Sequence, residues 1–65
     1  MTAAEIRAYK TRPTNSVKDT ARFMGVGIKE TYSAIHRNEL PALRLGRTIL
    51  VPTAKILALL GADET

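Results

Sequence analysis

Residues 25–52 read GVGIKETYSAIHRNELPALRLGRTILVP, and the pattern in this stretch governs the expected fold. Gly25 and Gly27 precede a short helical segment that ends at the polar corner Asn38-Glu39. An alternating Leu-Arg-Leu run, a Gly-Arg pair and an apolar, β-branched run then lead to Pro52. Glycine is suited to tight turns and helix ends because it has no Cβ. The order predicts a helix presented by a tight turn and followed by a basic β-hairpin.

The residues before this stretch predict another helix, from Val17 to Met24. Ser16 with Asp19 three residues later is a helix-start signal, although aspartate is shorter than the glutamate usual there. Gly25 is placed to end the helix in the left-handed conformation, and Val26 is then expected to be the buried residue of the turn. Two helices joined by a three- or four-residue turn containing glycine form a helix-turn-helix.

The second helix of this pair is expected over residues 28–37, with Gly27 as its N-cap. At about 100° per residue, one side is expected to face the first helix and consists of Ile28, Thr31, Ala34, Ile35 and Asn38. The other side carries Lys29, Ser33, His36 and Arg37, with Glu30 and Tyr32 on the flanks. Its hydrogen-bond donors and its size fit the major groove of duplex DNA. The alternative is an ordinary amphipathic surface helix; the position directly after the turn favours the DNA-binding interpretation.

A basic hairpin is expected to follow this helix. Leu43-Arg44-Leu45 alternates as a half-buried strand does. Gly46-Arg47 fits a two-residue turn with glycine first, and residues 48–51 form the return strand. A turn of just two residues places Arg44 on the same sheet face as Ile49, whereas a longer loop or a bulge separates them. The sequence leaves both alternatives open.

The N-terminal residues 1–15 are interpreted as a helix or as a frayed basic arm. Thr2 and Glu5 have the spacing of a capping box, which favours a helix over residues 3–10. In the helical alternative Ile6 and Tyr9 share one side and cover part of the core. The DNA-binding domain is expected to span residues 16–61.

The C-terminal part is expected to form a last helix that opens at Pro52-Thr53 and ends at Gly61. It is apolar over a wide arc, which carries Ile56, Leu57, Leu59 and Leu60. One interpretation is that this helix closes the core, and the other is that a leftover apolar patch contacts a partner. Residues 62–65 are expected to be a disordered tail.

Composition and charge narrow the function classes. The chain has 65 residues, a formal net charge of +4 and a pI near 10.0, which suits a single small domain that binds a polyanion. Cysteine is absent, and no histidine–acid cluster has metal-ligand spacing, so no metal and no cofactor are expected. No nucleophile has a neighbouring base in a motif context, so we expect neither an enzyme nor a small-molecule substrate. No apolar run reaches about 18 residues and the N-terminus lacks a signal peptide; we therefore expect no membrane partner and a cytoplasmic location.

Taken together, these motifs resemble the excisionase-type, MerR-like winged helix-turn-helix proteins, which are small DNA-binding factors of phages and integrative elements. The resemblance covers Ser16 to about Leu60, and the ordered run from Glu39 to Pro52 is its most specific part. It is carried by Ser16-Val17-Lys18-Asp19-Thr20-Ala21, Gly25-Val26-Gly27, Tyr32, Ala34, Ile35, Asn38-Glu39-Leu40-Pro41, Leu43-Arg44-Leu45-Gly46-Arg47 and Val51-Pro52. The expected fold is mainly α with a small β-hairpin: a winged helix-turn-helix with three to four helices and a two-stranded wing.

The resemblance implies how such a fold meets DNA. The second helix lies in the major groove, and the wing reaches the adjacent minor groove through the arginine after the turn glycine, here Arg47. Carried over by position, the DNA contacts are Lys29, Tyr32, Ser33, His36, Arg37, Arg44 and Arg47. Two positions depart from the family: Ile28 stands where members often have arginine, and Asn38 replaces the usual glycine. Glu30 is expected near phosphate, which it repels unless it accepts from a cytosine amino group.

Three hypotheses about function follow. The first, which the resemblance favours, is an excisionase-like recombination directionality factor in a bacterial host or phage-infected cell. Such a factor binds and bends attachment-site DNA, often as neighbouring copies, and biases a site-specific integrase toward excision. The second is a small transcriptional repressor or regulator that uses the same surface. The third is a protein-interaction module that docks through the apolar C-terminal helix.

Overall fold

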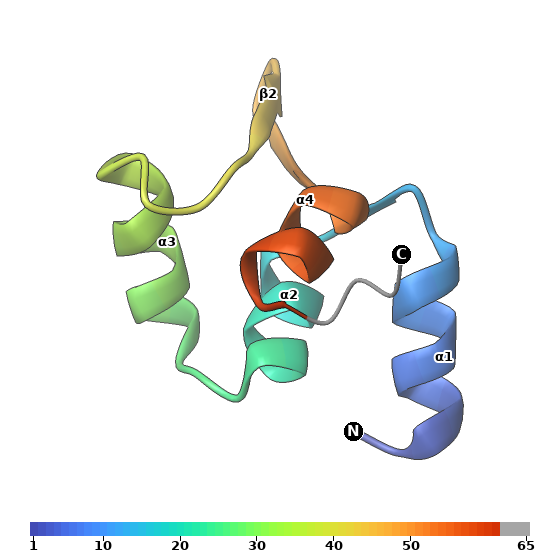
Figure 1. Cartoon of the computed structure of the whole chain (residues 1–65). Helices are drawn as coiled ribbons and strands as arrows, with labels where there is room; N and C mark the ends of the chain where they lie inside the picture. Colours follow the sequence, from blue (N-terminus) through green and yellow to red (C-terminus); the bar gives the residue numbers. More distant parts are fainter. Residues whose placement is uncertain (62–65) are drawn as a thin grey trace.

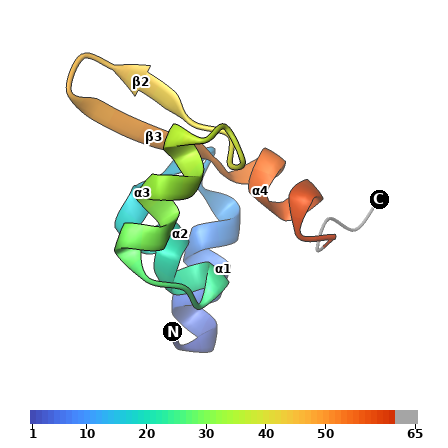
Figure 2. The same cartoon turned by 90° about the vertical axis from the view of Figure 1, so that its left-hand side faces the viewer.

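A computed structural model describes residues 1–61, which form four helices and a three-stranded antiparallel sheet. The elements run in the order α1 (Ala3–Thr11), β1 (Thr14–Asn15), α2 (Val17–Met24), α3 (Ile28–His36), β2 (Leu43–Leu45), β3 (Thr48–Pro52) and α4 (Thr53–Leu59). Helices α1 and α3 lie on opposite sides of the molecule, and the β2–β3 hairpin projects from it (Figures 1 and 2). The expected disordered tail, residues 62–65, lies outside the described residues. None of the helices within residues 1–61 is both long and apolar enough to span a membrane.

The first two helices begin where the capping signals predict. At α1 the Thr2 hydroxyl accepts from the Glu5 backbone N–H, and the Glu5 carboxylate accepts from the Thr2 backbone N–H, which completes a capping box. At α2 the Ser16 hydroxyl accepts from the backbone N–H of Asp19 at 3.0 Å. Gly25 ends α2 with φ +74°, the left-handed conformation that other residues adopt only at a cost.

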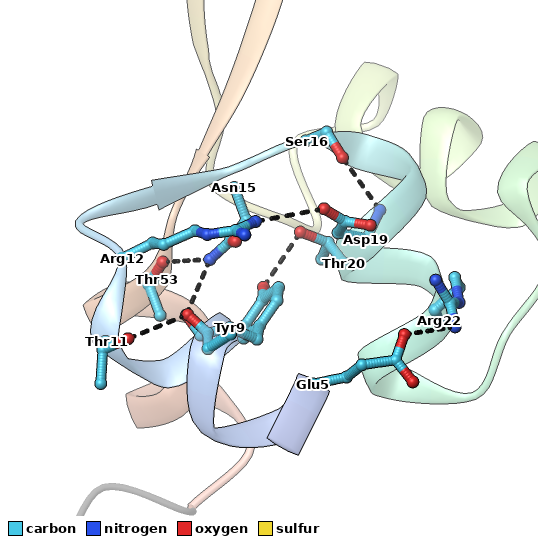
Figure 3. A network of polar contacts seen from close by, with 11 residues as sticks. Glu5, Tyr9, Thr11, Arg12, Asn15, Ser16, Asp19, Thr20, Arg22 and Thr53 are labelled. Atoms are coloured by element: carbon cyan, nitrogen blue, oxygen red, sulfur yellow. Dashed lines mark hydrogen bonds and ion pairs between the residues drawn. The ribbon is translucent and has the colours of Figure 1, made fainter. Parts of the chain in front are cut away.

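The N-terminal residues form a docked helix, α1, and not a frayed arm. Tyr9, on α1, is buried against α2, and its ring stacks on Phe23. Its hydroxyl lies 3.0 Å from the Thr20 hydroxyl (Figure 3). The side chain of Asn15 donates to the Tyr9 carbonyl and to the Thr53 hydroxyl. These contacts join α1, β1 and the start of α4 into one body.

The sheet contains one strand, β1, that was not predicted from the sequence. The predicted two-stranded hairpin is present, but β1 adds a third strand on the other edge of β3, giving the order β1-β3-β2. Thr14 lies opposite Pro52, and Asn15 lies opposite Val51. A two-residue strand carries no periodicity of its own, and its partner lies far along the chain, so no local pattern reveals it.

The core lies where α2, α3, β3 and α4 meet. Its buried apolar side chains are Val17, Ile35, Val51 and Ile56, with Phe23, Leu40, Ala42 and Ile49 packed against them. Helix α4 closes this core through Ile56, which is fully buried, while Leu59 and Leu60 remain exposed. The apolar C-terminal helix therefore has both features that the sequence suggested: a core-closing face and leftover exposed leucines.

Four predictions of burial are wrong, and one of them concerns Asn38, which is exposed and lies beyond the end of α3. Val26 is 47% exposed and Ile28 is also exposed, because the residues of the turn, 25–27, form an open corner of the molecule. Ile28 points in the same helical direction as Thr31, but all three residues of the first turn of α3, 28–30, are exposed. Strand β2 is exposed at all three residues instead of alternating, because it is an edge strand in a hairpin that extends beyond the body.

Candidate nucleic-acid interface

Helix α3 presents its polar side to solvent and anchors its other side in the core. Thr31 and Ile35 are buried, and Ala34 is half-buried. The five predicted contact residues of this helix and its C-cap are all exposed: Lys29, Tyr32, Ser33, His36 and Arg37. The helix ends at His36, one residue earlier than expected, and Arg37 is its C-cap. A polar stripe along one helix, free of covering structure, is available to an external partner.

The start of α3 carries a negative charge that does not lie on this stripe. The carboxylate of Glu30 folds back over Gly27, which is the N-cap residue. A carboxylate is favourable at a helix N-terminus because the unpaired backbone N–H groups there carry partial positive charge. The Glu30 carboxylate therefore lies against the N-terminus of α3. It is at the edge of the surface that Lys29 and Ser33 form.

The β2–β3 hairpin has the two-residue turn that the sequence left open. Leu45 pairs with Thr48, so Gly46 and Arg47 alone form the turn, and Arg44 lies opposite Ile49. Gly46 has φ +61°, whereas Arg47 does not have a positive φ, a combination typical of a type II′ turn. Arg47 is thereby held at the tip of the projecting hairpin, where its side chain is exposed.

A direct contact connects the hairpin to α3. The Arg44 guanidinium lies with Nη2 3.3 Å from Nδ1 of His36, and both side chains are exposed. Arginine has only hydrogen-bond donors, so the guanidinium is the donor in this contact. The contact means that Arg44, from β2, and His36, from the last turn of α3, occupy the same side of the molecule.

Arg37 is already engaged by a neighbour. Its Nε and Nη2 donate to one carboxylate oxygen of Glu39 at 3.2 and 3.0 Å, and both side chains are largely exposed. Surface ion pairs of this kind contribute little to stability and open easily. The sequence did not reveal this pairing, although the two-residue separation across the left-handed residue Asn38 makes it possible.

The other ion pairs lie on the far side of the molecule. Arg12 pairs with Asp19, and Arg22 pairs with Glu5, both across the α1–α2 junction (Figure 3). Within residues 1–61, no ion pair involves Lys29, Arg44 or Arg47. In the described part of the chain, Lys29, Arg44 and Arg47 are thus unpaired cations on the α3–hairpin side, while Arg7, Lys10 and Lys18 are unpaired cations on α1 and α2.

One further cation borders this side and was not among the predicted contacts. Lys55, on α4, lines a hollow at the base of the hairpin together with Asn38 and Leu43. A sequence signal for it existed: residues 40–62 contain no acid, and their cations are Arg44, Arg47 and Lys55. This acid-free stretch covers the hairpin and α4, so the positive field extends from α3 past the hairpin.

Comparison with models of protein families, with curated proteins and with solved structures gives no match for this chain.

Proposed function

We propose that this chain is a winged helix-turn-helix protein that binds duplex DNA in a sequence-specific manner. In this proposal α3 is the recognition helix in the major groove, and the β2–β3 hairpin is the wing in the adjacent minor groove. The observation that carries the proposal is the contact between His36 and Arg44, which brings the helix and the hairpin onto one exposed side. The uncompensated charge on that side supplies the attraction to phosphate.

The individual residues divide between phosphate binding and base recognition. Most protein–DNA hydrogen bonds go to the backbone, so Lys29, Arg37 and Arg44 are assigned mainly to phosphates. Ser33 and His36 lie on the exposed stripe of α3 and are the candidates for base edges. Tyr32 is assigned to a phosphate through its hydroxyl. Arg47 at the turn is assigned to the minor groove, where a narrow width concentrates negative potential.

Salt-dependent binding tests the proposal. Four bound cations, Lys29, Arg37 and Arg44 at phosphates and Arg47 in the minor groove, at about −0.9 each give a slope of about −3.6 in log affinity against log salt. Affinity for a short labelled duplex should then fall on the order of a hundredfold between about 50 and about 200 mM salt. Arg47→Ala should weaken binding by about 1–3 kcal/mol if its contact is base-specific, and less if it is to phosphate. Lys10→Ala, on α1, is the control. Binding that is absent, or indifferent to salt, refutes the proposal.

Among DNA-binding roles, we favour an excisionase-like architectural factor that directs an integrase toward excision. The support is the resemblance carried by residues 16–60. A recombination assay on the attachment sites of the element that encodes the protein is the appropriate test. The excisionase role fails if adding the protein leaves integrase-mediated excision unchanged. DNA binding without that effect favours a transcriptional repressor instead.

A protein-interaction module is the second candidate, and a specific observation favours it. Leu59, which is 55% exposed, and Leu60, which is 48% exposed, are adjacent at the end of α4. Exposed apolar patches often mark interfaces. The two candidates separate cleanly, because Leu59→Ala should leave salt-dependent DNA binding intact, whereas a module that docks through α4 should lose its partner.

A further inference from the structure

The tip of the β2–β3 hairpin carries an exposed leucine that the fold does not use. Leu45 is 63% exposed, more than any other large apolar side chain that the structure describes. It lies directly before the turn, and its cross-strand neighbour Thr48 is exposed as well. The hairpin projects from the helices at this end, so no other element approaches the tip (Figure 2). Leu45 therefore has no role in the core and is available to an external surface.

The charges around Leu45 indicate what kind of surface this is. Arg44 and Arg47 flank it in sequence, and the nearest acid before it is Glu39. Protein–protein interfaces are depleted of charged residues at their centre, although arginine itself is common in them. An apolar side chain between two arginines instead fits a polyanion with an apolar interior. The minor groove of duplex DNA has this character, with phosphates along its edges and stacked bases at its floor.

The two faces of the hairpin suit the two sides of that groove. Successive strand residues point to opposite faces, so Leu45 and Arg44 point away from each other. Arg44 contacts His36 and therefore faces α3. A hairpin tip that enters the groove has one backbone wall on each side. Arg44 then meets the backbone wall nearer α3. Leu45 points away from α3, toward the sugars and base edges on the other side of the groove.

We propose that Leu45 is an apolar wedge that enters a base step of the minor groove and bends the duplex. The inference rests on the proposed DNA-binding function and specifies how the wing engages DNA. Wedges of this kind partly unstack a step and kink the duplex toward the major groove. Pyrimidine–purine steps such as TA open most easily, so Leu45 gives the protein a preference for flexible steps that needs no hydrogen bond to a base.

The test uses a short duplex in which a fluorescent adenine analogue occupies a TA step, since its emission rises when the base is unstacked. Wild-type protein should raise the emission and bend the duplex, measured by energy transfer between end labels. It should bind a TA-containing duplex about tenfold tighter than a duplex of stiff steps, and this ratio should approach one for Leu45→Ala. Leu45→Met, which keeps an apolar side chain of similar size, should retain the bend.

Leu59→Ala is the matched control, because it removes a comparably exposed leucine from α4 and should leave every readout unchanged. Circular dichroism checks that each variant is folded. If wild-type protein shows no salt-dependent binding, the proposed function falls and the wedge falls with it. If it binds but does not raise the emission, or if Leu45→Ala raises the emission and bends DNA as wild type does, the wedge alone is overturned.

Discussion

Arg37, an expected DNA contact, forms an ion pair with Glu39 inside the proposed interface. Arg37 donates two hydrogen bonds to Glu39, so one of its expected phosphate donors is engaged before DNA arrives. The pair is exposed and therefore weak, but Glu39 also places a negative charge where phosphate is expected. We predict that Glu39→Gln tightens DNA binding several-fold and steepens its salt dependence, because Arg37 becomes free to neutralise a phosphate. Fluorescence anisotropy over a salt series measures both effects.

Glu5→Gln is the control for this prediction, because it removes the same formal charge from the other side of the molecule. Glu5 pairs with Arg22 across the α1–α2 junction, away from α3 and the hairpin. If both variants tighten binding equally, the effect comes from net charge alone and the local role of Glu39 is wrong.

Glu5 also makes the acid stability of the fold predictable. The backbone N–H of Thr2, then the Thr2 hydroxyl and Arg22, lower the pKa of Glu5 below its ordinary value. A lowered pKa in the folded state means that the ionised carboxylate favours folding. The contribution is therefore present above the ordinary pKa and is lost as the pH falls through the lowered one. We predict that wild-type protein loses more stability than Glu5→Gln between about pH 6 and about pH 3 in urea unfolding. Parallel losses in the two proteins contradict this.

Among the secondary-structure elements, the sequence predicted the bounds of those that have a capping residue at each end. It did not predict the two-residue strand β1 or which residues would be exposed. Helix α2 has the predicted bounds, Val17–Met24, because Ser16 and Gly25 act within a few residues of each end. Helical periodicity likewise gives the direction of Ile28, but it does not tell whether a neighbour covers that direction. Burial is a property of tertiary contacts, and for this reason the expectations for Val26, Ile28 and strand β2 failed.

The docking of α1 on α2 yields a prediction about how elements depend on one another. The hydroxyls of Tyr9 and Thr20 lie 3.0 Å apart and are buried. Tyr9→Phe leaves the Thr20 hydroxyl without this partner, and Thr20→Val does the same to Tyr9. Each change should destabilise the protein by about 1–3 kcal/mol, the cost of an unsatisfied buried group. The double variant should lose less than the sum, because it removes both polar groups together.

Denaturant unfolding of the four proteins completes this cycle and measures the coupling. Additive effects would mean that the two hydroxyls do not stabilise each other, and the contact between α1 and α2 would then rest on the stacking of Tyr9 on Phe23 and on the two ion pairs across the junction.

For the whole molecule, the sequence indicated which residues carry charge but not which of them lie on the same side of the fold. Lys29 and Arg47 were expected contacts because of the motifs around them, and their exposure suits that role. The contact between His36 and Arg44 depends on where the hairpin returns relative to the end of α3. That return is set by the sheet and by packing of Val51 and Ile56, which are long-range contacts. Local patterns contain no information about such distances, so the shared side of α3 and the hairpin was a hypothesis until the fold was known.

The presence of exposed cations on both sides of the molecule supports a last prediction. Arg7 and Lys10 are exposed on α1, on the opposite side from α3 (Figure 1), whereas Lys29 and Arg47 are on α3 and at the hairpin tip. Each double alanine variant removes two positive charges, so the two have the same net charge.

If DNA lies along α3 and the hairpin, Lys29→Ala with Arg47→Ala should reduce the salt slope by about two, since each phosphate contact contributes about one. Arg7→Ala with Lys10→Ala should leave the slope near the wild-type value, although weaker long-range attraction lowers the affinity slightly at low salt. Equal slopes for the two variants would mean that binding follows total charge and not a defined face, and the orientation proposed for DNA would be wrong.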